Sequence, residues 1–214
     1  MRFSTVLFDL DGTLINTNEL IIASYDHVFR TCLNLTIPRE TIRAHIGETL
    51  MNTMASYDAN RAQELCDFYR TFNLEHHDRL IERYEGVQEA IHQLHAAGVK
   101  LAVVTSKHTQ LARRGLELAG LHPYFDLLIG VDQVEKPKPD PESIYVACEK
   151  LGVQPGPEIL MMGDTHFDIR TGRNAGVKTI CVGWTIQDRA ELEALKPDFW
   201  VEQPHDLVRL VLGE

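Results

Sequence analysis

The sequence contains few cysteines, and no two of them stand close together. The four thiols are separated by more than thirty residues each, at Cys32, Cys66, Cys148 and Cys181. This spacing provides no C-x-x-C pair, which excludes a zinc knuckle and gives no sign of a disulfide framework. We therefore expect four buried free thiols.

A long apolar run is also missing. No stretch approaches the ~18 consecutive apolar residues that a membrane-spanning helix needs. The apolar start of the chain is broken by Asp9 and Asp11 before the hydrophobic region of a signal peptide could form. These features predict a cytoplasmic protein with no membrane partner.

Basic residues are in deficit: 21 Lys and Arg face 31 Asp and Glu, which gives a formal net charge of -10. This charge repels a polyphosphate backbone, so we expect no nucleic-acid partner. A small anionic substrate would have to be attracted by local positive charge, and a bound cation is the most direct source.

The 214 residues, 44% of them hydrophobic, are enough for a sizeable core. Five short apolar runs are typical of strands buried on both faces, at residues 5–8, 101–104, 127–129, 159–162 and 179–182. Helical periodicity fills most of the intervals, at residues 87–97, 111–119, 141–151 and 165–175, and a glycine follows each of these helices. This alternation predicts an α/β fold, a Rossmann-like doubly wound parallel sheet with helices on both faces.

The alternation fails between residues 16 and 83, where helical patterns continue without a convincing strand. Thr17 or Asn18 can cap a first helix, Pro38 suits the first turn of a second, and Gly47 separates the second from a third. We therefore expect an inserted α-helical cap domain.

The corresponding domain division places residues 1–15 and 84–214 in the α/β core. Residues 16–83 form the helical cap.

Polar residues of the kinds found in catalytic and metal-binding sites follow several predicted strands. Asp9, Asp11, Gly12 and Thr13 follow the first strand, Thr105-Ser106-Lys107 the second, Lys136 and Lys138 the third with its loop, and Asp164 and Asp168 the fourth. Each motif alone has an ordinary explanation as a turn or a helix cap. Turns and helix caps do not explain why all of these motifs occur at strand ends. Ligands bind at the carboxyl ends of parallel strands, so the joint occurrence indicates a functional site.

The acidic residues of these motifs indicate a metal site. Asp9 and Asp11, two residues apart in an extended segment, point to the same side, and Asp164 arrives from a neighbouring strand. Converging carboxylates repel each other, and a divalent cation with oxygen ligands relieves the repulsion. Magnesium fits best, since it binds through one or two carboxylates together with substrate phosphate oxygens.

The four motifs, in this order, resemble those of the haloacid-dehalogenase superfamily of phosphohydrolases. The resemblance covers the whole chain, because the helical insertion is similar to the small α-helical cap of that family. It implies a magnesium-dependent reaction in which Asp9 attacks phosphorus and forms an aspartyl phosphate. It also implies that Asp9, the backbone carbonyl of Asp11 and Asp164 hold Mg²⁺, with Asp168 giving support from the outer shell.

The remaining roles follow from the same resemblance. Asp11 suits the general acid that protonates the leaving oxygen and then the base that activates water. Thr105 and Lys138 offer a hydroxyl and a cation to the phosphoryl oxygens, while Lys136 is the less favoured of the two lysines. Three further residues near the phosphoryl group, Ser106, Gly12 and Thr13, are candidates for substrate binding.

Substrate choice is expected to depend on the cap. Residues 12–20 resemble the corresponding segment of the superfamily's pyrophosphatases, which implies a functional link to HPr dephosphorylation, and also that of phosphoglycolate phosphatases. Arg43, His45 and Lys107 are candidates to bind a second anionic group. Inorganic pyrophosphate is the leading substrate, and phosphoglycolate or another small phosphomonoester is the alternative. A β-phosphoglucomutase-like mutase and a non-catalytic anion-binding protein remain further alternatives.

Overall fold

The computed structural model describes residues 2–213. Its body is a six-stranded parallel sheet with the order β5-β4-β1-β6-β7-β8. The strands are β1 (Thr5–Phe8), β4 (Lys100–Val104), β5 (Leu127–Ile129), β6 (Ile159–Gly163), β7 (Lys178–Val182) and β8 (Phe199–Val201). The predicted doubly wound α/β fold is confirmed, and all five predicted strands are present.

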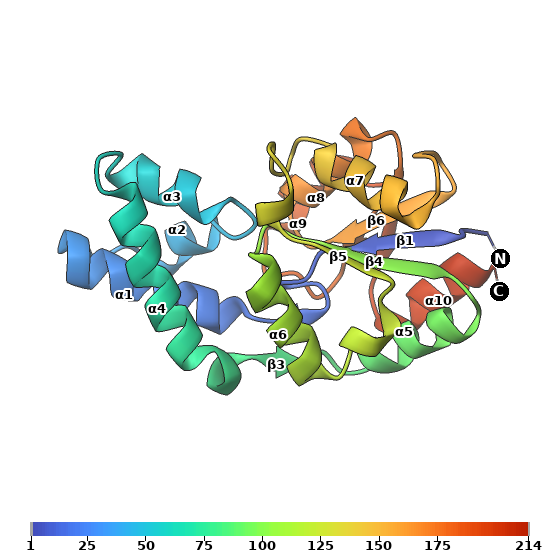
Figure 1. Cartoon of the computed structure of the whole chain (residues 1–214), viewed down its shortest axis with the longest axis horizontal. Coiled ribbons are helices and arrows are strands. Elements are labelled where there is room, and N and C mark those ends of the chain that lie inside the picture. The colour runs from blue at the N-terminus through green and yellow to red at the C-terminus, as the bar shows by residue number, and fades with distance from the viewer. Residues whose placement is uncertain (1, 214) are drawn as a thin grey trace.

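Helices cover both faces of the sheet (Figure 1). One face carries α5 (Val87–Ala96), α6 (Thr109–Ala119) and α10 (Pro204–Leu212), and the other carries α7 (Glu142–Leu151), α8 (His166–Asn174) and α9 (Arg189–Ala194). Side chains along β1 alternate between the two cores: Val6 and Phe8 pack with the α5 side, and Leu7 packs with the α7 side. This alternation explains why β1 reads as a continuous apolar run.

The helices between residues 16 and 83 pack on one another beside the sheet. They are α1 (Asn18–Leu33), α2 (Arg39–Arg43), α3 (Leu50–Tyr57) and α4 (Ala62–Leu80), and Figure 1 shows them on one side of the core. They enclose a separate hydrophobic cluster that includes Tyr25, Phe29, Met54 and Leu65. We call these four helices and their loops the cap.

Two short strands connect the cap to the core. β2 (Ile15–Asn16) and β3 (Glu82–Arg83) pair antiparallel, so the outgoing and returning chains lie side by side. The proposed boundary at 15/16 divides β2, and the one at 83/84 follows the last residue of β3. The division into residues 1–15 with 84–214 and 16–83 stays our proposal.

Several local features differ from expectation. Thr17 occupies the N-cap position of α1, but its side chain makes no capping hydrogen bond; its hydroxyl instead donates to Asp11 Oδ1 at 2.7 Å. The edge strand β8 and the helix α10 were not predicted from the sequence, because a three-residue edge strand gives only a weak pattern.

Within residues 2–213, no helix has both the length and the apolar character required to cross a bilayer.

Candidate active site

Three adjacent strands bring the predicted motifs together. Because β1 lies between β4 and β6, the residues that follow these strands, Asp9, Thr105 and Asp164, meet at one edge of the sheet. The backbone N–H of Asp9 donates to Met162 O at 2.8 Å, and that of Thr105 donates to Ile129 O at 3.0 Å. The sheet ladder therefore continues into the site and holds its backbone in place.

A buried cluster of three carboxylates lies at this edge. Ligand oxygens of Asp9, Asp164 and Asp168 all lie within 4.8 Å of one another. Asp164 Oδ1 accepts a hydrogen bond from Thr13 Oγ1 at 3.3 Å. Asp164 Oδ2 is buried and has no hydrogen-bond partner among the described residues. A buried carboxylate oxygen without a hydrogen-bond donor is costly, and a bound cation would relieve this cost.

Lys138 connects two of these carboxylates. Its Nζ donates to Asp9 Oδ1 at 2.8 Å and to Asp168 Oδ1 at 2.6 Å, and the lysine is buried. Lys136 is exposed, and its backbone N–H donates to Glu142 Oε2. The structure therefore brings Lys138, and not Lys136, into the carboxylate cluster.

Asp168 has two functions in this geometry. Its Oδ2 accepts hydrogen bonds from the backbone N–H and the hydroxyl of Thr165, which completes a capping box at the start of α8. Its Oδ1 accepts from Lys138. Asp168 thus stabilises the helix start and at the same time positions the lysine.

Two glycines make room for the carboxylates. Gly12 has φ +81°, and a Cβ at this position would lie 2.4 Å from Asp164 Oδ2. A Cβ on Gly163 would lie 2.2 Å from Asp168 Cγ. Any side chain at either position would displace a carboxylate, so the close approach of the acidic groups depends on glycine.

Burial strongly affects the ionisation of the cluster. Burial, and secondarily the charge of Asp168, raises the pKa of Asp9 to about 7, although Lys138 opposes the shift. Burial, together with Asp168 and Asp9, raises the pKa of Asp164 well above its ordinary value. Burial alone would lower the pKa of Lys138, but Asp168 and Asp9 outweigh it and raise that pKa.

These groups fit a hard divalent cation. The cluster offers only oxygen donors, one lysine compensates its charge incompletely, and no group within residues 2–213 donates to Asp164 Oδ2. Oxygen ligands of this kind are typical of magnesium sites. Asp9 and Asp164 are the best-placed ligands, since Asp168 already uses both of its oxygens.

The carboxylate of Asp11 lies apart from this cluster. Its Oδ1 accepts hydrogen bonds from Thr17 Oγ1 and Lys107 Nζ, both at 2.7 Å. Its side chain is therefore not a fourth carboxylate of the metal cluster, and the predicted metal contact through its backbone carbonyl stays a prediction. In this position the carboxyl group faces the space between core and cap.

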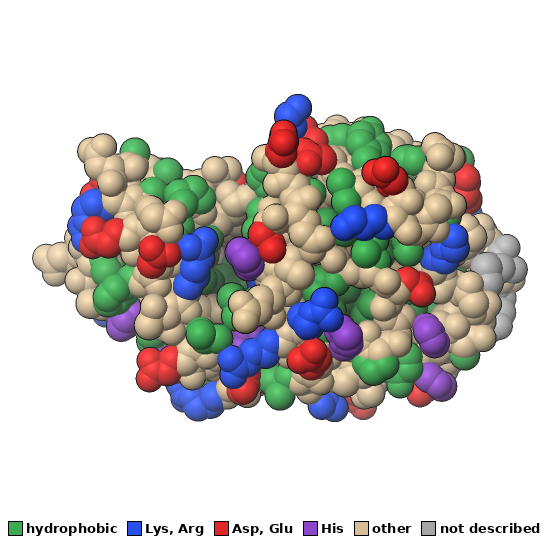
Figure 2. All heavy atoms as spheres, in the orientation of Figure 1, with side chains coloured by type: hydrophobic (Ala, Val, Ile, Leu, Met, Phe, Trp, Pro, Cys, Tyr) green, Lys and Arg blue, Asp and Glu red, His purple; other side chains and the backbone are tan. Residues whose placement is uncertain are grey.

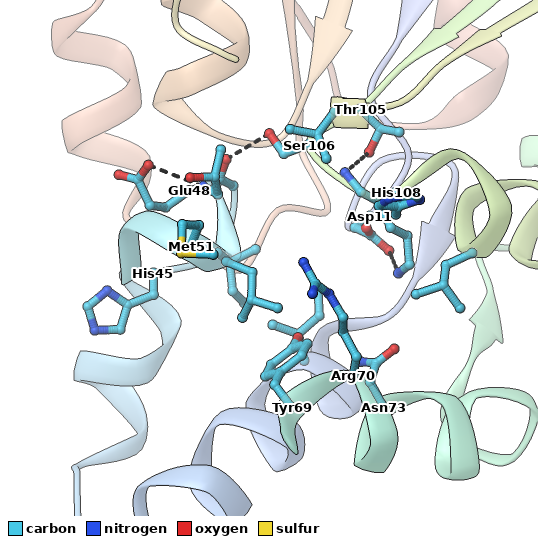
Figure 3. A pocket seen from close by; sticks show the side chains of 18 of the residues that line it. Asp11, His45, Glu48, Met51, Tyr69, Arg70, Asn73, Thr105, Ser106 and His108 are labelled. Carbon is cyan, nitrogen blue, oxygen red and sulfur yellow. Dashed lines mark hydrogen bonds and ion pairs between the residues drawn. The ribbon is translucent and has the colours of Figure 1, made fainter. Parts of the chain in front are cut away.

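A cavity of ≈190 Å³ separates the cap from the core (Figure 3). Asp9 and Asp11 line its core side, together with Thr105, Ser106 and Lys107. Ser106 Oγ also donates to the carbonyl of Gly47 in the cap, at 3.1 Å. In the space-filling view, the surface is hollowed between the two halves of the molecule, and basic and histidine side chains stand around the hollow (Figure 2).

The cap residues that were expected to bind substrate differ in whether they line the cavity. Arg43 is not among the residues that line the cavity, and it forms an ion pair with Glu40 at 2.8 Å, so its role in substrate binding stays a prediction. His45 lines the cavity, and its Nε2 lies 2.9 Å from the hydroxyl of Tyr57. Arg70 of α4 also lines the cavity and was missed.

Comparison with known proteins agrees with this architecture. The model of the haloacid dehalogenase-like hydrolase family matches residues 6–182. The chain belongs to this family of hydrolases, as its motifs predicted. It is similar to the pyrophosphatase PpaX of Bacillus cereus (strain B4264), with 46% identity over 211 residues, which cover 99% of this chain and 97% of that relative.

Solved structures share the fold. A haloacid dehalogenase-like hydrolase from Bacteroides fragilis gives a TM-score of 0.89 at 23% identity and covers 96% of this chain and 99% of its own. A predicted phosphoglycolate phosphatase from Haemophilus somnus gives a TM-score of 0.82 at 25% identity, with 98% of each chain covered.

Proposed function

We propose that this protein is a magnesium-dependent phosphohydrolase that converts inorganic pyrophosphate and water into two phosphates. The observation that carries the chemistry is the buried trio of Asp9, Asp164 and Asp168, with Lys138 between two of them and one carboxylate oxygen left without a partner. The full-length similarity to a protein named as a pyrophosphatase supports the choice of substrate.

Asp9 is the nucleophile of the proposed reaction. One of its oxygens bonds to phosphorus while the bond from phosphorus to the leaving oxygen breaks, which gives an aspartyl phosphate. Lys138 and the hydroxyl of Thr105 stabilise the phosphoryl oxygens. Bound magnesium would act as a Lewis acid on the phosphoryl group and favour the ionised form of Asp9. Ser106 also lines the cavity and completes the proposed phosphoryl site, whereas the backbone N–H groups of Gly12 and Thr13 already donate to the carbonyls of Ile15 and Leu10.

Asp11 handles the proton in both half-reactions. It donates a proton to the leaving oxygen, and it then takes a proton from the water that attacks the aspartyl phosphate, so that Asp9 is regenerated. The hydrogen bonds from Thr17 and Lys107 hold its carboxyl group at the cavity and away from the other three carboxylates. This position suits an acid–base group better than a metal ligand.

The size of the cavity favours a small substrate. Its ≈190 Å³ is below the roughly 300–1,000 Å³ of pockets that accept drug-sized ligands. Pyrophosphate and phosphoglycolate both suit this space. Phosphoglycolate stays the second candidate because a structural neighbour carries that name. Pyrophosphatase activity would also connect the protein to HPr dephosphorylation, which releases pyrophosphate.

A substrate panel tests the proposal. We expect the purified protein with Mg²⁺ to have its highest kcat/KM on pyrophosphate, lower values on phosphoglycolate and sugar phosphates, and none after addition of EDTA. A maximum on phosphoglycolate would replace the substrate. Transfer of phosphate between sugar positions without release of inorganic phosphate would indicate a mutase, and no turnover of any compound would indicate an anion-binding protein.

The two lysines of the third motif offer a matched pair of variants. Lys138→Ala should lower kcat on pyrophosphate by roughly 10²- to 10³-fold, because it removes a buried cation from the reacting groups. Lys136→Ala should change kcat by less than about 2-fold, since that side chain is exposed. Steady-state kinetics at saturating Mg²⁺ measure both. A larger loss in Lys136→Ala would show that the motif has been misaligned by two residues.

A further inference from the structure

The cap contributes a cation to the cavity that none of the motifs includes. Arg70 lies on α4, where Tyr69, Arg70 and Asn73 all line the cavity. Figure 3 shows the Arg70 side chain extending from α4 into the space between Met51 of the cap and Asp11 of the core. Its guanidinium group therefore faces the catalytic groups across the substrate space.

The other basic groups that line the cavity are already engaged. Lys107 donates to Asp11 at 2.7 Å, and His45 Nε2 lies 2.9 Å from the Tyr57 hydroxyl. His108 Nδ1 lies 3.6 Å from Asp132 Oδ2. These partners leave Lys107 and the two histidines poorly placed to bind a second anionic group of the substrate.

Arg70, by contrast, is only weakly held. Within residues 2–213, Arg70 Nη1 donates a hydrogen bond to Asp67 Oδ1 at 2.9 Å, and the two side chains are 44% and 60% exposed. An exposed i,i+3 ion pair of this kind contributes little to stability. A guanidinium group has five N–H donors in a planar fork, so Arg70 can bind an anion in the cavity while it keeps or exchanges this partner.

The acidic groups near the cavity do not cancel this charge. Glu48 lines the cavity, but its Oε1 accepts hydrogen bonds from the Thr49 backbone N–H at 3.1 Å and from Asn52 Nδ2 at 2.9 Å. Asp11 is paired with Lys107. Arg70 is thus a cap cation with donors available to an anion.

We propose that Arg70 is a specificity-determining residue that binds the second anionic group of the substrate, the one that is not transferred to Asp9. This inference rests on the proposed phosphohydrolase function. In pyrophosphate the second group is the leaving phosphate. As Asp9 bonds to the reacting phosphorus, the electron pair of the breaking P–O bond moves to that phosphate, and the guanidinium group offsets the charge there.

The test compares two substrates and two arginines of the same helix. Arg70→Met should lower kcat/KM for pyrophosphate by roughly 10- to 100-fold, the size expected for loss of a charged hydrogen-bonding group. For p-nitrophenyl phosphate, which has no second anion, the loss should be less than about 3-fold. The matched control is Arg79→Met, since Arg79 is an exposed residue of α4 outside the cavity lining; it should change neither value. Arg70→Lys should recover part of the loss.

Three results would overturn the assignment. An equal loss on both substrates would indicate a general structural role for Arg70. No loss on either substrate would show that Arg70 does not contact substrate. An equal effect of Arg79→Met would indicate a property of the whole helix. If the wild-type protein does not hydrolyse pyrophosphate, the proposed substrate is wrong. In that case phosphoglycolate and methyl phosphate, one with a second anion and one without, test Arg70 in the same way.

Discussion

Asp9→Asn is expected to abolish turnover and to leave the fold intact. The amide has almost the same size as the carboxylate, but it cannot attack phosphorus as an anion, and the amide is also a poorer ligand for a cation. Loss of a covalent nucleophile typically costs on the order of 10⁴-fold or more in kcat. Phosphate release from pyrophosphate measures activity, and circular dichroism with thermal melting measures the fold.

A matched control is Asp26→Asn. Asp26 pairs with Arg30 on the surface of α1, so its amide variant should change kcat by less than about 2-fold. If Asp9→Asn retained turnover at the wild-type rate, Asp9 would not be the nucleophile and the proposed mechanism would fail.

Asp164→Asn is expected to move activity and stability in opposite directions. The change removes a metal ligand, so turnover on pyrophosphate should fall by roughly 10³-fold or more. It also removes one of three buried carboxylates that share a single lysine. The new amide keeps an oxygen for Thr13 and gains an N–H₂ donor for the neighbouring carboxylates. In EDTA the free energy of unfolding should therefore rise by on the order of 1 kcal/mol.

The pH dependence of stability follows from the raised pKa of Asp9. Its pKa in the folded state is raised by burial to about 7, from an ordinary value of 3.8. Between these values the folded carboxyl holds a proton that the unfolded chain releases, so the stability of the metal-free protein falls as the pH rises through this window. Magnesium binding requires the ionised form, so stabilisation by Mg²⁺ should increase from pH 5 to pH 8. In Asp164→Asn the Mg²⁺-dependent gain in Tm should be nearly absent.

An Asp164→Asn protein that is less stable than the wild type in EDTA would contradict the claim that the three buried carboxylates destabilise the metal-free fold. A full Mg²⁺-dependent gain in Tm in this variant would show that the ion binds elsewhere. Thermal melting with and without Mg²⁺ distinguishes these results.

The groups that were predicted most accurately from sequence lie at the ends of buried strands. Asp9, Thr105 and Asp164 each follow an apolar run that has few alternatives to a central parallel strand. Once β1 lies between β4 and β6, their proximity follows from the sheet itself. The strand signal therefore predicted that most of the proposed catalytic residues lie close together.

Residues on the cap helices could not be placed in the same way. Whether Arg43 or Arg70 faces the core depends on the rotation of α2 and α4 and on how the cap rests against the sheet, and local periodicity does not determine this orientation. Thr17 or Asn18 was expected to cap α1; Thr17 holds the N-cap position, but its hydroxyl donates to Asp11 instead. The Thr17 hydroxyl thus makes a tertiary hydrogen bond to a site residue in place of a capping hydrogen bond to the helix backbone. Local sequence patterns do not reveal this choice of partner.

The most direct test of the central claim is a crystal structure of the protein soaked in Mn²⁺, which replaces Mg²⁺ at oxygen sites and scatters anomalously. We predict one strong anomalous peak at the edge of the sheet, within about 2.2 Å of carboxylate oxygens of both Asp9 and Asp164. A crystal in which Asp164 Oδ2 has no metal neighbour, while manganese occupies other positions on the protein, would contradict the claim that these carboxylates share a catalytic ion.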